Sequence, residues 1–239
     1  MNDAEVVARQ KRTAARAAAE LVEEGMRVGL GTGSTVAFLL EALAERQLRD
    51  VSCVATSPAT ERAARALGLT VRASEELEEL DVAIDGADQI DPSGWLVKGG
   101  GGAHTREKIV AAAARCFVVI ASAEKAVAQL SPPVPLELMR FGVRSTLRSL
   151  AHARLRPSSS EAPSTEASST ISTAAQVTPD GGLLADYLGP FADPRELAAR
   201  LSATPGVVDH GLFEPQMVSV ILIARPEGVE QRSGGKEGG

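Results

Sequence analysis

Apolar and polar positions along the chain indicate strands and helices in regular succession. Short apolar runs typical of buried strands cover residues 26–30, 51–55, 82–84 and 117–120. Runs with apolar residues at helical spacing cover residues 4–24, 36–46, 58–67 and 105–115. Strands that alternate with helices through short Gly, Ser and Thr loops are typical of βαβ units. The pattern therefore predicts an α/β fold with a mostly parallel sheet.

The pattern changes at residues 131–135 (SPPVP), a proline cluster of the kind that separates domains. Residues 136–150 then suggest a short strand and a helix, and later runs suggest a strand at 183–187 and a helix at 194–201. The apolar residues 218–223 are expected to return to the main sheet.

Two segments lack the apolar side chains that ordering requires. Residues 157–173 are rich in Ser, Thr, Ala and Glu, and we expect a mobile loop there. The tail from Gly228 to Gly239 is rich in Gly and charged residues, and we expect it to be disordered.

Composition narrows the classes of partner. Of the 239 residues, 44% are hydrophobic and 23% charged, as in ordinary globular proteins. The formal net charge of −6 argues against nucleic acid as the main partner, because nucleic-acid binding depends on basic surfaces. An anionic substrate would have to be captured by local cations and backbone amides.

No apolar run approaches the roughly 20 residues that a membrane-spanning helix needs, so no membrane partner is expected. The N-terminal stretch lacks the apolar core of a signal peptide, and we expect a cytoplasmic location. Cys53 and Cys116 lie in apolar runs without the spacing of a metal or redox site, so both are expected to be reduced thiols in the core.

Residues 98–109 (KGGGGAHTREKI) form the segment richest in chemical signals. Four consecutive glycines lead into the predicted start of a helix, where unpaired N–H groups favour anions. Glu107 stands in the first turn of that helix between Arg106 and Lys108. This arrangement suggests a phosphorylated substrate and a base for proton transfer. A mobile surface loop followed by a charged helix is the alternative.

Two further loops follow predicted strands. Residues 31–35 (GTGST) lack the dinucleotide and P-loop glycine patterns, which leaves a loop of amides and hydroxyls for a phosphate or a sugar, or an ordinary tight turn. Asp85, Asp88 and Asp91 are spaced three residues apart. Because the calcium-loop spacing is absent, hydrogen bonding and proton exchange with sugar hydroxyls fit these acids better than a metal.

Several motifs together resemble type A ribose-5-phosphate isomerase, which interconverts ribose 5-phosphate and ribulose 5-phosphate. The matching segments are GLGTGST (29–35), TS (56–57), DGADQID (85–91), KGGGGAHTREKI (98–109), EK (124–125) and PGVVDHGLF (205–213). The resemblance covers residues 1–150 and 177–228 in order. It implies a Rossmann-like sheet flanked by helices, with a smaller α+β domain inserted before the last strands.

The resemblance also implies roles for individual residues. Glu107 corresponds to the general base, while Asp85, Asp88 and Lys98 would line the sugar and assist ring opening and charge stabilisation. The implied substrate-binding residues are Thr32, Gly33, Ser34, Thr35, Asp85, Gly86, Ala87, Asp88, Lys98, Gly99, Gly100, Gly101 and Lys125. Lys125 would contact the phosphate. The resemblance implies no cofactor and no metal. It also implies a homo-oligomer, either a dimer or a tetramer.

The domain boundaries follow from the same comparison. We expect residues 1–130 and 207–228 to form the main α/β domain with the active site. Residues 131–206 would form the small α+β domain, and residues 229–239 the disordered tail. The small domain departs from the family pattern at residues 157–173 and 178–182.

Two other functions remain open at this point. A non-catalytic phosphosugar sensor would share the architecture, but it would need a DNA-binding domain for which the single N-terminal helix leaves no room. A relative of the coenzyme A transferases would use a glutamate as a nucleophile in a related fold. The residues around Glu107 favour the isomerase over both.

Overall fold

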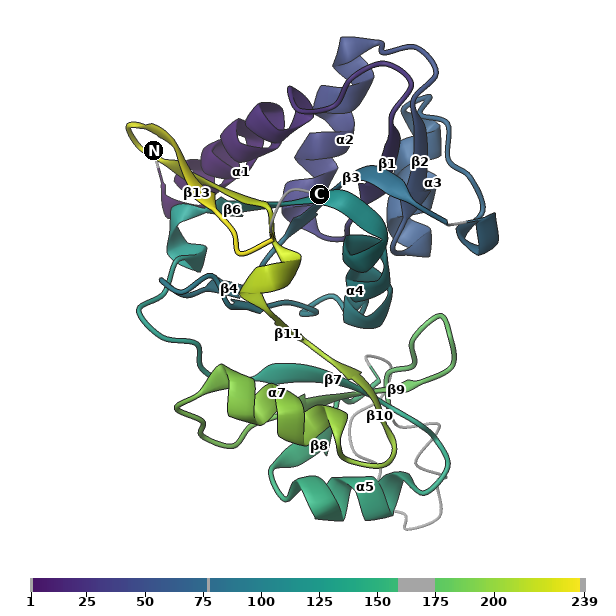
Figure 1. Cartoon of the computed structure of the whole chain (residues 1–239), viewed down its shortest axis with the longest axis vertical. Coiled ribbons are helices and arrows are strands. Elements are labelled where there is room, and N and C mark those ends of the chain that lie inside the picture. Colours follow the sequence, from purple (N-terminus) through teal and green to yellow (C-terminus); the bar gives the residue numbers. More distant parts are fainter. Residues whose placement is uncertain (1, 77, 159–174, 237–239) are drawn as a thin grey trace.

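The computed structural model describes residues 2–76, 78–158 and 175–236. A six-stranded sheet forms its larger part, in the order β13-β12-β6-β3-β1-β2 (Figure 1). All neighbouring strands are parallel except β12 and β13. The strands are β1 (Arg27–Leu30), β2 (Ser52–Ala55), β3 (Leu80–Gly86), β6 (Ala114–Ser122), β12 (Val220–Arg225) and β13 (Gly228–Ser233). The predicted α/β class with a mostly parallel sheet is confirmed.

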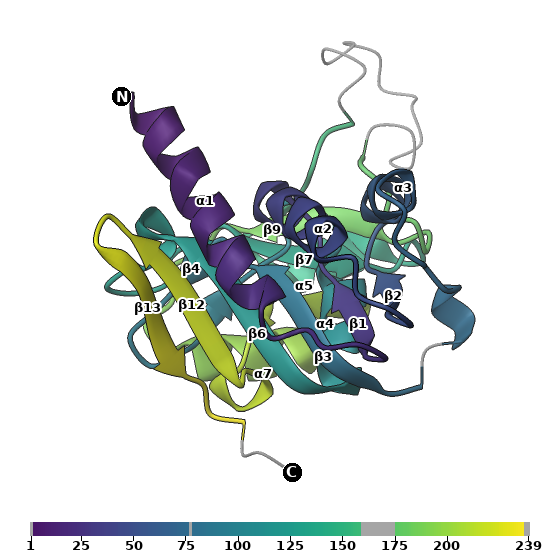
Figure 2. The ribbon, with the colours of Figure 1, turned by 90° about the horizontal axis from the view of Figure 1, so that it is seen from above.

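Helices cover both faces of this sheet. On one face lie α1 (Asp3–Ala19) and α2 (Ser34–Arg46), which also pack against each other (Figure 2). The opposite face is covered by α4 (His104–Ala113), which contacts β3 and β6. At the β2 end, α3 (Pro58–Ala66) packs beside α2. The sheet is therefore buried on both faces, which explains the nearly continuous apolar runs of its central strands.

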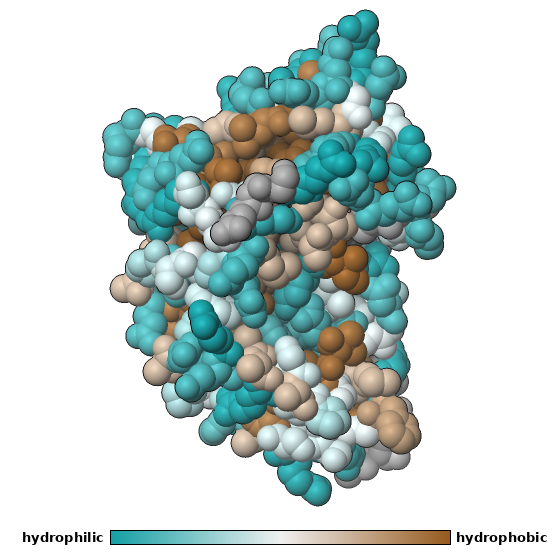
Figure 3. Space-filling view, in the orientation of Figure 1, coloured by the Kyte–Doolittle hydropathy of each residue, from teal (hydrophilic) through white to brown (hydrophobic). Residues whose placement is uncertain are grey.

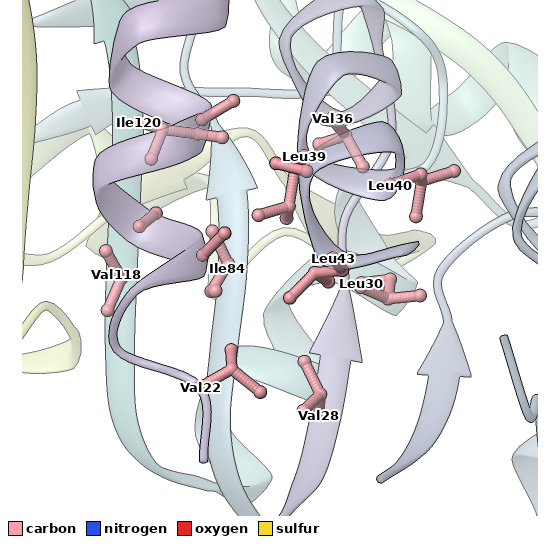
Figure 4. Close-up of a cluster of buried hydrophobic side chains, with 14 of the residues drawn as sticks. Val22, Val28, Leu30, Val36, Leu39, Leu40, Leu43, Ile84, Val118 and Ile120 are labelled. Atoms are coloured by element: carbon pink, nitrogen blue, oxygen red, sulfur yellow. The ribbon is translucent and has the colours of Figure 1, made fainter. Parts of the chain in front are cut away.

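The apolar cluster between α1, α2 and the sheet is shown in Figure 4. Leu39 and Leu43 of α2 face Leu30 of β1 and Ile84 of β3, and Leu39, Leu30 and Ile84 have no exposed surface. Leu30 is the last residue of β1, and Ile84 lies near the end of β3, so the cluster adjoins the strand ends that lead into the site described below.

A second sheet, which we call the small lobe together with its two helices, lies below the first in Figure 1. Its four strands are antiparallel in the order β10-β7-β9-β8. Its elements are β7 (Val134–Leu138), α5 (Val143–Leu150), β8 (Ala153–Leu155), β9 (Leu183–Tyr187), α7 (Pro194–Ser202) and β10 (Val207–His210). It has its own apolar cluster, which includes Leu136, Leu138 and Leu201.

Short elements connect the two parts. A three-stranded antiparallel sheet, β11-β5-β4, is formed by β4 (Gln89–Ile90), β5 (Leu96–Val97) and β11 (Leu212–Phe213). Three 3-10 turns complete the described elements: η1 (Ser74–Glu76), η2 (Ala123–Lys125) and η3 (Pro215–Met217). No helix in the described ranges is both long and apolar enough to span a bilayer. Cys53 and Cys116 are free thiols.

Strand β12 confirms the predicted return of residues 218–223 to the main sheet, because it pairs in parallel with β6. The disordered tail predicted for residues 229–239 is wrong over its first part, because β13 pairs along its whole length with β12. Val229 also packs against the main apolar cluster. The composition of this segment suggested disorder, but a hairpin partner supplies its backbone with hydrogen bonds.

The strand pairing does not follow the expected return to the main domain at residue 207. Strand β10 begins there and pairs with β7 of the small lobe, so the chain rejoins the large sheet only at β12. The other domain boundaries remain a prediction. Of the loop predicted at residues 157–173, Pro157 and Ser158 are described and the rest lies outside the described residues.

We expect Leu39→Ala to lower the free energy of unfolding by about 2–5 kcal/mol, because it leaves a cavity between α2 and the sheet. The matched control is Leu21→Ala at a side chain that is 44% exposed, where we expect a change within about 0.5 kcal/mol. Urea denaturation measures both values. Equal losses in the two variants would contradict this assignment of the core.

Candidate active site

The residues with chemical signals meet where strand order reverses. From β1 the sheet continues to β2 on one side and to β3 on the other. The carboxyl ends of β1 and β3 therefore flank a crevice of the kind that binds ligands in open α/β sheets. The loop after β1 brings Thr32 to this crevice, the loop after β3 brings Asp88, and η2 after β6 brings Lys125.

Three charged side chains are buried together beneath the crevice. The Nζ atom of Lys98 donates a hydrogen bond to Asp85 Oδ2 at 2.8 Å and lies 3.2 Å from Glu107 Oε2. It also donates to the carbonyl oxygen of Gly86 at 2.5 Å. The side chains of Lys98, Asp85 and Glu107 are 2%, 4% and 3% exposed. We refer to these three residues as the buried triad.

The backbone holds Asp85 firmly in place. Its Oδ1 accepts hydrogen bonds from the amides of Thr32 at 3.1 Å and Gly86 at 2.7 Å. A side chain on Gly31 would place its Cβ 1.9 Å from the Asp85 carboxyl carbon. Glycine at position 31 is therefore needed for the close approach of β1 and Asp85.

The three-stranded connecting sheet, β11-β5-β4, places Lys98 beside Asp85 and Glu107. Lys98 follows β5 directly, and its amide donates to the carbonyl oxygen of Gly211 at 2.8 Å, next to β11. Glu107 lies in the first turn of α4 and faces inward, whereas Arg106 and Lys108 point to the small lobe. Arg106 pairs with Asp180, and Lys108 Nζ donates to Asp209 Oδ1 at 2.6 Å.

The triad shifts the proton affinities of its members. Burial raises the pKa of Glu107 to about 8; the charges of Asp85 and Asp88 act in the same direction, and Lys98 opposes them. Burial also raises the pKa of Asp85 against the effect of Lys98. For Lys98, burial lowers the pKa, but the two carboxylates outweigh it and the pKa is raised overall. Lys98 is therefore a cation at neutral pH, and Glu107 can exchange a proton there.

The glycine loop, Gly99 to Gly102, forms one wall of the crevice. Gly99 has a φ of 96°, and a Cβ there would lie 2.6 Å from that of His104. The amide of Gly100 donates to Asp88 Oδ2 at 2.8 Å. Within the described part of the chain, the amides of Gly99 and Gly101 donate to no backbone or side-chain acceptor. These amides are available to a ligand.

Two helices that contribute to the crevice begin without a side-chain cap. The cap positions are Gly33 for α2 and Ala103 for α4, and neither makes a side-chain hydrogen bond. Each helix start therefore presents unpaired N–H groups and the positive end of its dipole, which favour an anion.

Two lysines stand beside the start of α2. Lys11 of α1 donates from Nζ to Ser34 Oγ at 2.9 Å. Lys125 belongs to η2 and is half-buried. The segments are tied together, because the Gln10 side chain accepts a hydrogen bond from the Ala123 amide at 3.2 Å. Both lysines line the same cavity of about 180 Å³.

This cavity brings together almost every residue predicted from the sequence. Its lining comprises Lys11, Thr32, Gly33, Ser34, Thr35, Gly86, Ala87, Asp88, Lys98, Gly99, Gly100, Gly101, Glu107 and Lys125. Asp85 is the exception, since it lies below the floor and contacts Lys98 from underneath. Lys11 was missed by the sequence analysis. It belongs to no local motif and reaches the cavity only because α1 packs against α2.

A larger cavity, about 620 Å³, lies on the outer side of α4 and contains none of the triad. Its exposed apolar side chains are Ile109, Met139, Phe141 and Val208. Figure 3 shows apolar surface beside α4, where the small lobe meets the main sheet. This cavity lacks the buried triad and the convergent lysines of the smaller one, so the chemistry is assigned to the latter.

Two observations concern groups that the site does not use directly. Among the residues described, no cluster of three or more His, Cys, Asp or Glu side chains has the arrangement of a metal site. His104 is fully buried, and burial lowers its pKa to about 3, so its ring is neutral. It packs against Gly99 and fills space behind the glycine loop.

Comparisons with known proteins identify the family of this chain. The family model for ribose 5-phosphate isomerase A (phosphoriboisomerase A) matches residues 52–228. Ribose-5-phosphate isomerase A of Roseiflexus castenholzii is 44% identical over 230 residues, which cover 92% of this chain and 93% of the relative.

Solved structures of this family share the fold of the chain. Ribose 5-phosphate isomerase A from Methanocaldococcus jannaschii is 30% identical with a TM-score of 0.83, over 94% of this chain and 98% of that one. A D-ribose-5-phosphate isomerase in complex with phospho-erythronic acid is 28% identical with a TM-score of 0.84, over 98% of this chain and 100% of that one. The predicted resemblance is confirmed: this chain belongs to the ribose 5-phosphate isomerase A family of aldose–ketose isomerases, which interconvert ribose 5-phosphate and ribulose 5-phosphate.

Proposed function

We propose that this chain interconverts ribose 5-phosphate and ribulose 5-phosphate through an enediolate, with Glu107 as the general base. The observation that carries this assignment is the buried carboxylate of Glu107, whose pKa of about 8 suits proton exchange near neutral pH. A cation, Lys98, lies 3.2 Å away and can offset the charge that develops on the substrate.

The phosphate is expected to bind between Lys11, Lys125 and the uncapped start of α2. These groups supply two positive charges and several free amides on one side of the cavity. Glu107 lies among the lining residues contributed by the glycine loop and α4. Binding energy from the phosphate can therefore orient the other end of the sugar over Glu107.

In the proposed reaction, Glu107 removes the proton from C2 of the open-chain aldose and delivers it to C1. The electron pair from the C2–H bond forms the C1–C2 double bond, and the carbonyl oxygen becomes an oxyanion. Lys98 and the free amides of Gly99 and Gly101 are the donors available to that oxygen. The hydroxyl proton on the C2 oxygen then moves to the C1 oxygen. Glu107 returns its proton to C1 as the electron pair of the C1–C2 double bond forms the new C1–H bond and the C2 oxygen becomes the carbonyl of the ketose.

Ring opening needs a group that accepts a hydroxyl proton at the mouth of the cavity. Asp88 suits this role better than Asp85, because Asp88 is exposed and lines the cavity. Asp85 is buried, and its two oxygens already accept hydrogen bonds from Lys98, Thr32 and Gly86. We assign Asp85 to holding Lys98 as a cation beside Glu107.

We expect Glu107→Gln to lower kcat for ribose 5-phosphate by roughly 10²–10⁴-fold, since it removes the base but preserves the shape of the side chain. KM should change little. The matched control is Glu41→Gln on an exposed position of α2, which should retain normal turnover. A coupled assay of ribulose 5-phosphate formation measures both. Near-normal turnover by folded Glu107→Gln would remove Glu107 from the role, and a folded wild-type protein that binds the sugar without converting it would favour the sensor.

The pH dependence of kcat/KM should follow the ionisation of Glu107 in the free enzyme. The carboxylate must be ionised to accept the C2 proton, so kcat/KM should rise about tenfold per pH unit below pH 8 and level off above it. Initial rates over a range of ribose 5-phosphate concentrations give kcat/KM at each pH between 6.5 and 9. A flat profile over this range would contradict the raised pKa.

Lys11→Ala and Lys125→Ala should each raise KM for ribose 5-phosphate by roughly 10–100-fold, because each removes a hydrogen bond to a charged group. Their kcat/KM for unphosphorylated ribose should stay at the wild-type value. Arg16→Ala, at an exposed position of α1, serves as the control and should leave KM unchanged. If KM for ribose 5-phosphate stays constant in both lysine variants, the phosphate lies elsewhere.

A further inference from the structure

The side chain of Arg156, in the small lobe, is hydrogen-bonded to the glycine loop. This residue follows β8, and its Nη1 donates hydrogen bonds to the carbonyl oxygens of Gly99 at 3.2 Å and Gly100 at 3.1 Å. The contact joins the small lobe to the wall of the cavity beside Glu107. Arg156 itself is not among the lining residues, so it acts on the cavity from behind.

The guanidinium of Arg156 is fixed on its other side by Asp186 of β9. Nε donates to Asp186 Oδ2 at 2.9 Å, and Nη2 donates to Oδ1 at 2.6 Å. This fork geometry uses both carboxylate oxygens and leaves Nη1 for the glycine loop. The two side chains are only 14% and 22% exposed, so water screens the pair little.

The orientation of the two carbonyl groups determines that of the next two amides. In a trans peptide the C=O and the following N–H point in opposite directions. Fixing the carbonyl of Gly99 therefore directs the Gly100 amide to Asp88, with which it is bonded. Fixing the carbonyl of Gly100 directs the Gly101 amide away from Arg156, and Gly101 lines the cavity with its N–H unpaired.

We infer that Arg156 is a positioning residue for the isomerisation. It holds the glycine loop so that the Gly100 amide points to Asp88 and the Gly101 amide points to the substrate oxygen. A run of four glycines has high backbone freedom and would otherwise lose entropy when the oxyanion forms. Donors that are already oriented stabilise an oxyanion without reorganisation. The inference rests on the proposed function.

The chain offers a closely matched control at Arg106. This residue also crosses from α4 to the small lobe and forms a fork with Asp180, at 2.6 and 2.7 Å. No hydrogen bond of Arg106 reaches a carbonyl of the glycine loop within the residues that the structure describes. Comparison of the two arginines therefore separates positioning of the loop from attachment of the lobe.

The experiment compares Arg156→Ala, Arg156→Lys and Arg106→Ala with the wild type. Measured are kcat and KM for ribose 5-phosphate and the inhibition constants of phospho-erythronic acid and inorganic phosphate. We expect Arg156→Ala to lower kcat roughly 10–100-fold, as for a misplaced oxyanion donor. The inhibition constant of phospho-erythronic acid should rise by a similar factor. Inorganic phosphate should bind within about twofold of wild type, because its site lies at the start of α2.

The remaining variants complete the test. Arg156→Lys keeps the charge but cannot form the fork and both carbonyl bonds, so it should recover only part of the loss. Arg106→Ala should keep the wild-type kcat. If Arg156→Ala does not fold, Arg156→Lys together with Asp186→Asn, which removes the charge that anchors the arginine, decides the question by the same measurements.

Three results would overturn the role of Arg156: equal effects in Arg156→Ala and Arg106→Ala, full recovery in Arg156→Lys, or equal weakening of phosphate and phospho-erythronic acid. The first would indicate attachment of the lobe alone, the second a charge effect, and the third a general loss of the cavity. The proposed function fails separately, by the absence of ribose 5-phosphate turnover in the folded wild-type protein.

Discussion

The structure depends on the burial of three charges, Asp85, Lys98 and Glu107, at the end of β3. Burial of unpaired charges costs several kcal/mol each, so the group persists only because Lys98 lies between two carboxylates and backbone amides bind Asp85. With both carboxylates ionised, the group would carry one negative charge in excess. Burial and this excess raise the pKa of Glu107 to about 8. The same burial that opposes folding therefore gives Glu107 the proton affinity of a base that works near neutral pH.

The rest of the site is arranged around this group. The reversal of strand order between β1 and β3 opens the crevice, and the start of α2 adds partial positive charge to it. Because the whole chain carries a net charge of −6, capture of an anionic sugar has to be local. Lys11 and Lys125 supply that local charge, and the small lobe supports the glycine loop from behind.

The sequence predicted those parts of the site that depend on local signals. The glycine loop, Asp88 after β3 and the loop after β1 each occupy short contiguous motifs, and the cavity brings them together. Lys11 and Arg156 could not be found in this way, because they reach the site through the packing of α1 and of the small lobe. For the same reason β13 was missed: its order depends on pairing with β12 rather than on its own composition. The oligomeric state, which no local signal encodes, remains a prediction.

The central claim is that a carboxylate moves a proton between C2 and C1 of the sugar. The most direct test is the conversion of ribose 5-phosphate by the wild-type protein in D₂O over many turnovers, followed by NMR of the ribulose 5-phosphate. A proton held on Glu107 between the two steps can exchange with solvent, so the account predicts deuterium at one of the two C1 hydrogen positions. Product without deuterium at C1, as a direct hydride shift would give, would contradict it.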